Sequence, residues 1–157
     1  MIYTELTKKA MRIAFDAHYG QTDRGNTPYI CHPLHVADQM PDERTTTAAI
    51  LHDVLEDTEL TAEDLRREGI PEDIIRIVEI LTRDKRISYG NYIDRIIASR
   101  NYDALLVKQA DLRHNMDESR TLKGSLPPSL MRRYQSAKVL IDEALTQCAG
   151  QQTLKFT

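Results

Sequence analysis

Apolar residues recur every three or four positions along most of the chain, which is the spacing of one face of an α-helix. The first such face contains Leu6, Ala10, Ile13, Ala14 and Ala17, and Gly20 follows it as a stop signal. Segments in which apolar and polar residues alternate, as they do in half-buried strands, are scarce. The pattern therefore predicts an all-α fold.

Turn and capping residues divide this pattern into seven or eight helices. Pro33 is placed to open the second, Asp42 to cap the third and Ser88 to cap a later one. The expected helices cover approximately residues 6–17, 33–40, 42–55, 61–68, 71–81, 88–97, 103–116 and 128–149. No repeat or low-complexity linker interrupts them. We therefore expect one helical-bundle domain over residues 1–157, with a core at about 6–120 and a C-terminal helix at about 128–149.

Composition and charge exclude several classes of protein. The chain carries 21 basic and 24 acidic residues, a net charge of −3, which argues against a general nucleic-acid binder. No apolar stretch is long enough to span a membrane, and the N-terminus lacks the pattern of a signal peptide. We therefore expect a cytoplasmic protein. Its two cysteines are too few for a disulfide scaffold, and we expect reduced thiols in or near the core.

Four polar residues occupy positions where apolar ones would cost less. His52 and Asp53 interrupt the apolar run 48–55, Asp111 follows a similar run, and His32 lies at a loop-to-helix junction. Burying an imidazole and a carboxylate costs several kcal/mol unless each has a strong partner, and a divalent cation satisfies both. Each residue alone has an ordinary alternative, such as a hydrogen-bonded core histidine or an acid in a cap or ion pair.

Three segments that contain these residues resemble the motifs of HD-domain metal-dependent phosphohydrolases. They read TPYICHP at 27–33, AAILHDVLEDT at 48–58 and VKQADLRHNM at 107–116. The match is more specific to the hydrolase domain of the RelA/SpoT family and its small stand-alone relatives. The resemblance implies the HD-domain helical fold, and it extends from about residue 6 to about residue 115.

The resemblance also implies a metal centre. Its ligands would be His32, His52, Asp53 and Asp111, and its ion Mn²⁺. A mixed nitrogen and oxygen donor set suits such a first-row ion better than a structural zinc, which usually takes thiolates. An ion with open coordination positions lowers the pKa of water and makes it a nucleophile near neutral pH.

Two acids follow the His-Asp pair by one helical turn. Glu56 lies four residues after His52, and Asp57 lies four after Asp53. A carboxylate in that place can orient the attacking water or accept its proton. The resemblance assigns Glu56 and Asp57 a catalytic role. The alternative from the residues alone is that Asp57 ends the helix and Glu56 is solvated.

The implied reaction is hydrolysis of guanosine 3′,5′-bis(diphosphate), or its 5′-triphosphate analogue, to GDP or GTP and pyrophosphate. The length leaves no room for the synthetase domain of long family members, so we expect degradation only. Three residues in or beside the motifs are candidates for contacts with this small-molecule substrate: Arg24, Lys108 and Asn115. The sequence does not specify the oligomeric state, the regulation or the catalytic rate.

Two acids keep other functions open. Asp23 and Asp117 stand where relatives commonly carry basic residues. A second hypothesis is therefore an HD phosphohydrolase that acts on another nucleotide or phosphorylated metabolite. A third is a non-catalytic module that senses nucleotides, although the intact set of ligand and acid residues argues against it.

Overall fold

The computed structural model describes the backbone of residues 1–120 and 126–154, and all regular structure in these ranges is helical. Its elements are α1 Glu5–Ala17, α2 Cys31–Asp38, α3 Glu43–Leu51, α4 Val54–Asp57, α5 Ala62–Arg67, α6 Glu72–Leu81, α7 Tyr89–Ala98, α8 Tyr102–Asn115, the 3₁₀ helix η1 Glu118–Arg120, and α9 Pro128–Leu154. The extended pairing described is one isolated bridge between Thr22 and Pro28. The predicted all-α fold is confirmed.

Several helix ends are fixed by the residues that the sequence indicated. The Asp42 side chain accepts a hydrogen bond from the backbone N–H of Thr45 at 2.8 Å, and Ser88 accepts one from Asn91 at 3.1 Å. These bonds satisfy N–H groups that have no partner within the first turn. Gly69 ends the α5 segment with a φ of 78°, a left-handed conformation that glycine adopts without strain.

The expected helix over 42–55 is interrupted, and this is why nine α-helices are found among the described residues. The interruption is a turn at His52 and Asp53, where Asp53 has φ −103° and ψ −5°. In a continuous helix two adjacent side chains point about 100° apart. The turn relaxes this constraint, and both side chains reach the same cluster of polar groups.

Three further details differ from the expectations. Helix α2 begins at Cys31 and not at Pro33, which fits in the first turn because its missing N–H has no helical acceptor there. Helix α9 continues to Leu154, five residues past the expected end. Both cysteines are free, as expected, but Cys31 is exposed while Cys148 is half-buried.

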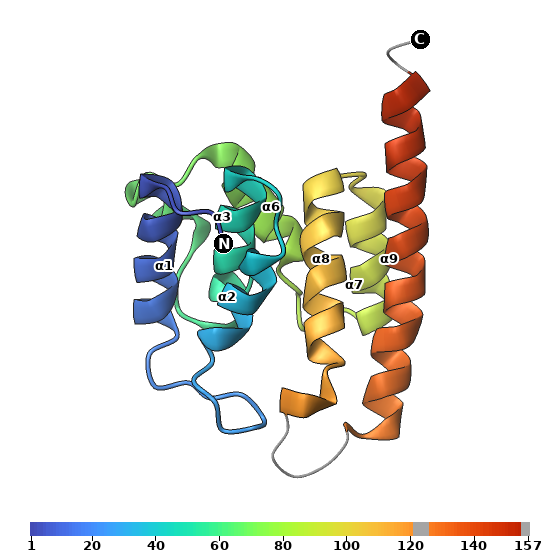
Figure 1. Cartoon of the computed structure of the whole chain (residues 1–157), viewed down its shortest axis with the longest axis horizontal. Helices are drawn as coiled ribbons and strands as arrows, with labels where there is room; N and C mark the ends of the chain where they lie inside the picture. Colours follow the sequence, from blue (N-terminus) through green and yellow to red (C-terminus); the bar gives the residue numbers. More distant parts are fainter. Residues whose placement is uncertain (121–125, 155–157) are drawn as a thin grey trace.

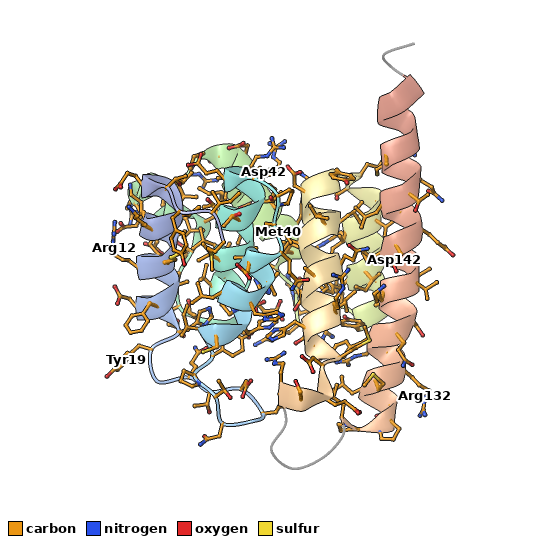
Figure 2. The ribbon with its side chains drawn as sticks, in the orientation of Figure 1. Arg12, Tyr19, Met40, Asp42, Arg132 and Asp142 are labelled. Carbon is orange, nitrogen blue, oxygen red and sulfur yellow. The ribbon has the colours of Figure 1, made fainter. Side chains whose placement is uncertain are left out.

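The helices form two groups that meet along α8 (Figure 1). On one side α3 packs against α1, α2 and α6, and on the other α9 packs along α8 and α7. Helix α3 is buried from Thr45 to Leu51, which makes it the centre of the core. Met40 lies among the packed side chains, whereas Arg12, Tyr19 and Arg132 point outward (Figure 2). None of the described helices is long and apolar enough to cross a bilayer.

The core contains polar side chains where α2, the end of α3 and α8 meet. Among the buried residues are His32, His52, Lys108, Asp111 and His114. Helix α8 carries three of them, and it has no simple apolar stripe because it lies between the two groups of helices. This junction positions the candidate site.

Candidate active site

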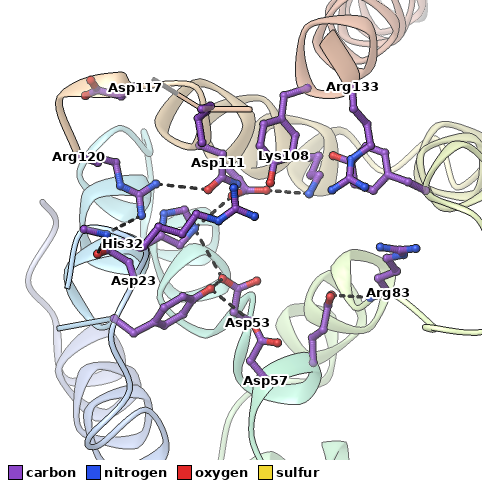
Figure 3. Close-up of a pocket in the computed structure, with 18 of the residues that line it drawn as sticks. Asp23, His32, Asp53, Asp57, Arg83, Lys108, Asp111, Asp117, Arg120 and Arg133 are labelled. Carbon is purple, nitrogen blue, oxygen red and sulfur yellow. Dashed lines mark hydrogen bonds and ion pairs between the residues drawn. The ribbon is translucent and has the colours of Figure 1, made fainter. Parts of the chain in front are cut away.

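A cavity of about 370 Å³ opens at this junction (Figure 3). Its lining comes from the loop 22–29, α2, α4 and the turn before it, the segment after α6, α7, α8, η1 and the start of α9. Eight predicted site residues line it, namely Arg24, His32, Asp53, Glu56, Asp57, Lys108, Asp111 and Asn115. The ninth, His52, is buried behind Asp53. The structure therefore brings together three segments that are distant in sequence.

Two imidazoles and two carboxylates converge at the floor of the cavity. His32 Nε2 lies 3.1 Å from Asp111 Oδ1 and 3.6 Å from Asp53 Oδ2. His52 Nε2 lies 3.1 Å from Asp53 Oδ2 and 3.8 Å from Asp111 Oδ1. One ligand atom each from His32, His52 and Asp53 lie within 4.8 Å of one another, a spacing that can hold a metal ion. Asp111 is not part of this group, but its Oδ1 lies near both imidazoles.

Both imidazoles use their Nδ1 atoms elsewhere. His52 Nδ1 lies 2.7 Å from the carbonyl oxygen of Ala49 and must donate to it, because a carbonyl only accepts. His52 Nε2 is buried, and the carboxylates of Asp53 and Asp111 that lie 3.1 and 3.8 Å away are not in hydrogen-bond geometry with it. A buried polar atom without a partner is uncommon and calls for a missing group. A divalent ion held by nitrogen and oxygen donors fits this gap.

The second imidazole is held by another histidine. His32 Nδ1 lies 2.7 Å from His114 Nδ1, so one ring donates and the other accepts. Burial and the positive charge of Arg120 lower the pKa of His114 to about 3, which keeps this ring neutral and able to accept. His114 also stacks on His35 with ring centroids 3.9 Å apart. His32 is thereby oriented with Nε2 toward the two carboxylates.

The carboxylates of the cluster are ionised despite their burial. Burial alone would raise the pKa of Asp111, but the ammonium of Lys108 and both imidazoles hold it well below its usual range. Burial would likewise lower the pKa of His52, but Asp53 and Asp111 raise it well above the ordinary value. Despite burial, the imidazoles of His52 and His32 likewise lower the pKa of Asp53, so two ionised carboxylates face the two imidazole nitrogens.

The two acids of α4 differ in their surroundings. Glu56 is half-buried, and its Oε2 accepts a hydrogen bond from the backbone N–H of Arg83 at 2.8 Å. Burial raises the pKa of Glu56. Asp57 is more exposed, and burial and the nearby charge of Asp53 raise its pKa. Glu56 is thus held inside the cavity and not fully solvated.

Tyr29 links the first motif to Asp53 and Asp57 of the second. Its hydroxyl donates to Asp53 Oδ2 at 2.6 Å and lies 3.5 Å from Asp57 Oδ2. The ring packs beside His18 and His32, with centroids 4.8 and 5.8 Å away. Tyr29 therefore orients the Asp53 carboxylate within the cluster.

Two of the expected substrate contacts also hold Asp111. Lys108 Nζ donates to Asp111 Oδ2 at 2.7 Å, and Asn115 Nδ2 donates to Oδ1 at 2.6 Å. Lys108 is buried and lies 5.0 Å from the centroid of the Tyr92 ring. Arg24, by contrast, is exposed where the loop lines the cavity.

Asp23 and Asp117, the two acids that keep other functions open, both have hydrogen-bond partners within the protein. Asp23 Oδ1 accepts backbone N–H groups of its own loop, and its Oδ2 lies 3.2 Å from the guanidinium of Arg120. At Gly25 an added Cβ would overlap the carbonyl oxygen of Arg120, so this loop packs closely on η1. Asp117 accepts hydrogen bonds from the N–H and the hydroxyl of Ser119. Arg120 thus offsets the charge that Asp23 adds to the cavity.

Sequence reasoning did not assign several residues of this cavity. Tyr29 and His114 stand inside the quoted motifs, three positions from His32 and Asp111, so the motifs themselves were the available signal. Arg83, Arg120 and Arg133 lie outside those motifs, and only the fold brings them to the cavity.

Comparisons with known proteins agree with this architecture. A family model described as an HD domain matches residues 10–122. The bifunctional (p)ppGpp synthase/hydrolase SpoT of Escherichia coli (strain K12) is 36% identical over 80% of this chain and 19% of its own length. A guanosine-3′,5′-bis(diphosphate) 3′-pyrophosphohydrolase of Vibrio cholerae is 31% identical over 96% of this chain and 23% of its own. The chain thus spans about a fifth of the length of these relatives.

A solved structure shares the fold over nearly the whole chain. It is described as a metazoan ortholog of SpoT that hydrolyzes ppGpp and plays a role in starvation responses. The two superpose with a TM-score of 0.72 at 21% identity, covering 97% of this chain and 98% of the other.

Proposed function

Because the chain belongs to the HD-domain family, we propose that it hydrolyses guanosine 3′,5′-bis(diphosphate), or its 5′-triphosphate analogue, to GDP or GTP and pyrophosphate. The observation that carries the proposal is the meeting of the His32, His52, Asp53 and Asp111 cluster with Glu56 and Asp57 in one cavity. The names of the relatives supply the substrate, since hydrolases of this nucleotide match 80–96% of the chain.

The four-residue cluster would hold one divalent ion, for which we propose Mn²⁺. The buried Nε2 of His52, which has no partner in hydrogen-bond geometry, and the two ionised carboxylates support this assignment. Mixed imidazole and carboxylate donors suit Mn²⁺ and similar first-row ions. The chemistry that such an ion supplies when bound is Lewis-acid activation of a phosphoryl group and of the water that attacks it.

The protein's own groups would handle protons and charge. Glu56 is anchored by the N–H of Arg83, and its raised pKa suits a carboxylate that accepts a proton from water. Asp57 would help to orient that water from the adjacent position. Arg24, with Lys108 behind Asp111, would offset the negative charge of the 3′-diphosphate.

A second candidate is hydrolysis of another phosphorylated nucleotide. It is favoured by Asp117, an exposed acid that lines the cavity where relatives carry a base. The paired state of Asp23 weakens this candidate, because Arg120 offsets that charge.

Product analysis separates the two candidates. The Mn²⁺-loaded protein is incubated with guanosine 3′,5′-bis(diphosphate), and the products are resolved by chromatography. GDP and pyrophosphate in equal amounts support the proposal, because water then attacks the phosphorus attached to the ribose 3′-oxygen. The bond between that phosphorus and the 3′-oxygen breaks, and pyrophosphate leaves as one unit. Release of orthophosphate, or turnover of other nucleotides only, would favour the second candidate. Asp53→Ala serves as the background control.

A further inference from the structure

Two hydrogen bonds between side chains and backbone join the end of α1 to the end of α4. His18, the residue that follows α1, is buried, and its Nδ1 lies 2.9 Å from Oε1 of Gln21. Nε2 of Gln21 donates to the carbonyl oxygen of Asp57 at 2.9 Å. Asp57 ends α4 and lines the cavity (Figure 3), whereas His18 and Gln21 do not line it. The two residues therefore reach this acid from outside the cavity.

The direction of both hydrogen bonds is fixed by chemistry. A carbonyl oxygen only accepts, so Gln21 turns its amide NH₂ toward Asp57 and its amide oxygen toward His18. Nδ1 of His18 must then donate. The other tautomer of the neutral ring would place the hydrogen on Nε2, which is buried without a hydrogen-bond partner among the described residues. A buried N–H in that state is costly, so a single tautomer satisfies both hydrogen bonds.

His18 also approaches the carboxylate of Asp57 by a second path. Its ring packs beside that of Tyr29, with ring centroids 4.8 Å apart. The hydroxyl of Tyr29 lies 3.5 Å from Oδ2 of Asp57. Asp57 is thus contacted at its main chain by Gln21 and at its carboxylate by Tyr29. His18 contacts both of these intermediates, so one buried ring supports both ends of the acid.

Helix α4 needs an anchor of this kind because it is only four residues long. A helix of one turn is not stable by itself, and the carbonyls of a last turn have no acceptor role within the helix. Gln21 supplies a donor to one of these carbonyls, that of Asp57. Glu56 is held differently, because its side chain accepts the backbone N–H of Arg83. Loss of Gln21 should therefore release Asp57 more than Glu56.

We propose that His18 and Gln21 are positioning residues that fix Asp57 where it orients the attacking water. This inference rests on the proposed function. It adds that the contact between α1 and α4 contributes to kcat although neither residue touches the substrate or the metal. Its distinguishing requirement is that the effect of both residues passes through Asp57 and not through Glu56. A residue that only stabilised the fold would not depend on which of the two acids is present.

A double-mutant cycle tests this requirement. Gln21→Leu removes both amide groups, and in the Mn²⁺-loaded protein it should lower kcat for guanosine 3′,5′-bis(diphosphate) about tenfold, because a small displacement of an orienting group is costly to the rate. KM should stay within about twofold of wild type. The same substitution should lower kcat less than about twofold in Asp57→Asn but again about tenfold in Glu56→Gln. An equal loss in all three backgrounds would overturn the proposal.

Gln39→Leu is the matched control. Gln39 also donates its Nε2 to a backbone carbonyl, that of His35 at 3.3 Å, but it is exposed and does not line the cavity. Its replacement should leave kcat unchanged. His18→Asn places an amide donor near the position of Nδ1 and should keep more of kcat than His18→Leu, which has no donor. Equal losses in His18→Asn and His18→Leu would overturn the role of His18 as a donor.

Amide hydrogen exchange distinguishes failure of this proposal from failure of the proposed function. The backbone N–H of Asp57 donates to the carbonyl oxygen of Asp53 at 2.9 Å. It should exchange about fivefold faster in Gln21→Leu than in Gln39→Leu, the size of one lost hydrogen bond. If wild type does not hydrolyse the bis(diphosphate) but this difference persists, the positioning of Asp57 stands and the proposed function falls. If hydrolysis occurs but Gln21→Leu and Gln39→Leu have equal kcat and equal exchange, the proposed function stands and the positioning role falls.

Discussion

Asp53 and Asp111 look alike in the sequence, as single acids at the edge of apolar runs, but the structure holds them in different ways. Asp53 lies in the turn between α3 and α4, and the donor to its carboxylate, Tyr29, comes from a distant loop. Asp111 lies inside the unbroken helix α8, and Lys108 and Asn115 of the same helix hold its two oxygens. One acid depends on tertiary contacts, and the other is held within a single helix.

This difference predicts which of the two carboxylates, that of Asp53 or that of Asp111, is easier to displace. Contacts within one helix form whenever the helix forms, because residues three and four apart share a face. The contact from Tyr29 exists only when the loop 22–29 is docked, and that loop rests on η1 through Asp23, Gly25 and Arg120. The position of the Asp53 carboxylate should therefore be more sensitive than that of Asp111 to substitutions outside the cluster.

The largest effect is expected from removal of Asp53 itself. Asp53→Ala leaves two imidazoles and one carboxylate, and it should reduce the Mn²⁺ content from one ion per chain to a small fraction, with turnover lost. Elemental analysis after gel filtration measures the metal content. Asp94→Ala, which changes an exposed acid on α7, is the control. Full Mn²⁺ occupancy in Asp53→Ala would show that the ligand assignment is wrong.

The next effect concerns an acid that would act on water and not on the metal. Glu56→Gln keeps the shape of the side chain and removes its proton acceptor, so kcat should fall roughly 10²-fold with Mn²⁺ retained. Burial raises the pKa of Glu56, and the group is inactive as a base when protonated. The wild-type rate should therefore fall as the pH drops through that raised pKa, above the usual range of a glutamate. Wild-type turnover in metal-loaded Glu56→Gln would exclude this role.

The helices and the four residues of the cluster could be predicted from the sequence for a physical reason. Helical spacing and capping depend on local chemistry, and a buried histidine or aspartate is costly enough to stand out. Ser88 and Asp42 cap helices as expected for this reason. The four cluster residues do meet, and the motifs had placed them in three separate segments.

What the sequence could not indicate depends on contacts between distant segments. The break at His52 and Asp53 is such a case, since the run 48–55 favours one continuous helix and the tertiary cluster overrides that preference. Arg83 lies in the irregular segment after α6 and Arg133 lies on α9, so only the packing of α9 beside α7 shows that both contact the ring of Tyr89.

A smaller effect on Mn²⁺ affinity is expected from the contact between His114 and His32. His114 lies on α8 with Asp111, and its Nδ1 contacts Nδ1 of His32, which lies on α2. His114→Phe removes the acceptor that orients His32 and should weaken Mn²⁺ binding roughly tenfold, the usual size for a partner of a metal ligand. His114→Asn places an oxygen near the same position and should restore part of the affinity. Competition titration with a chelating dye measures both, and identical affinities for Phe and Asn would contradict an orienting role.

The smallest effect tests the comparison most directly. Tyr29→Phe deletes the hydroxyl that donates to Asp53 Oδ2 at 2.6 Å but keeps the ring that packs beside His18. Loss of one such hydrogen bond costs about 1 kcal/mol, which corresponds to about fivefold weaker Mn²⁺ binding. Tyr19→Phe, which alters a tyrosine whose side chain is 81% exposed, should change nothing. The same chelator titration is the measurement. If Tyr29→Phe binds Mn²⁺ as tightly as Tyr19→Phe, Asp53 does not need its distant donor, and the two carboxylates are held equally well.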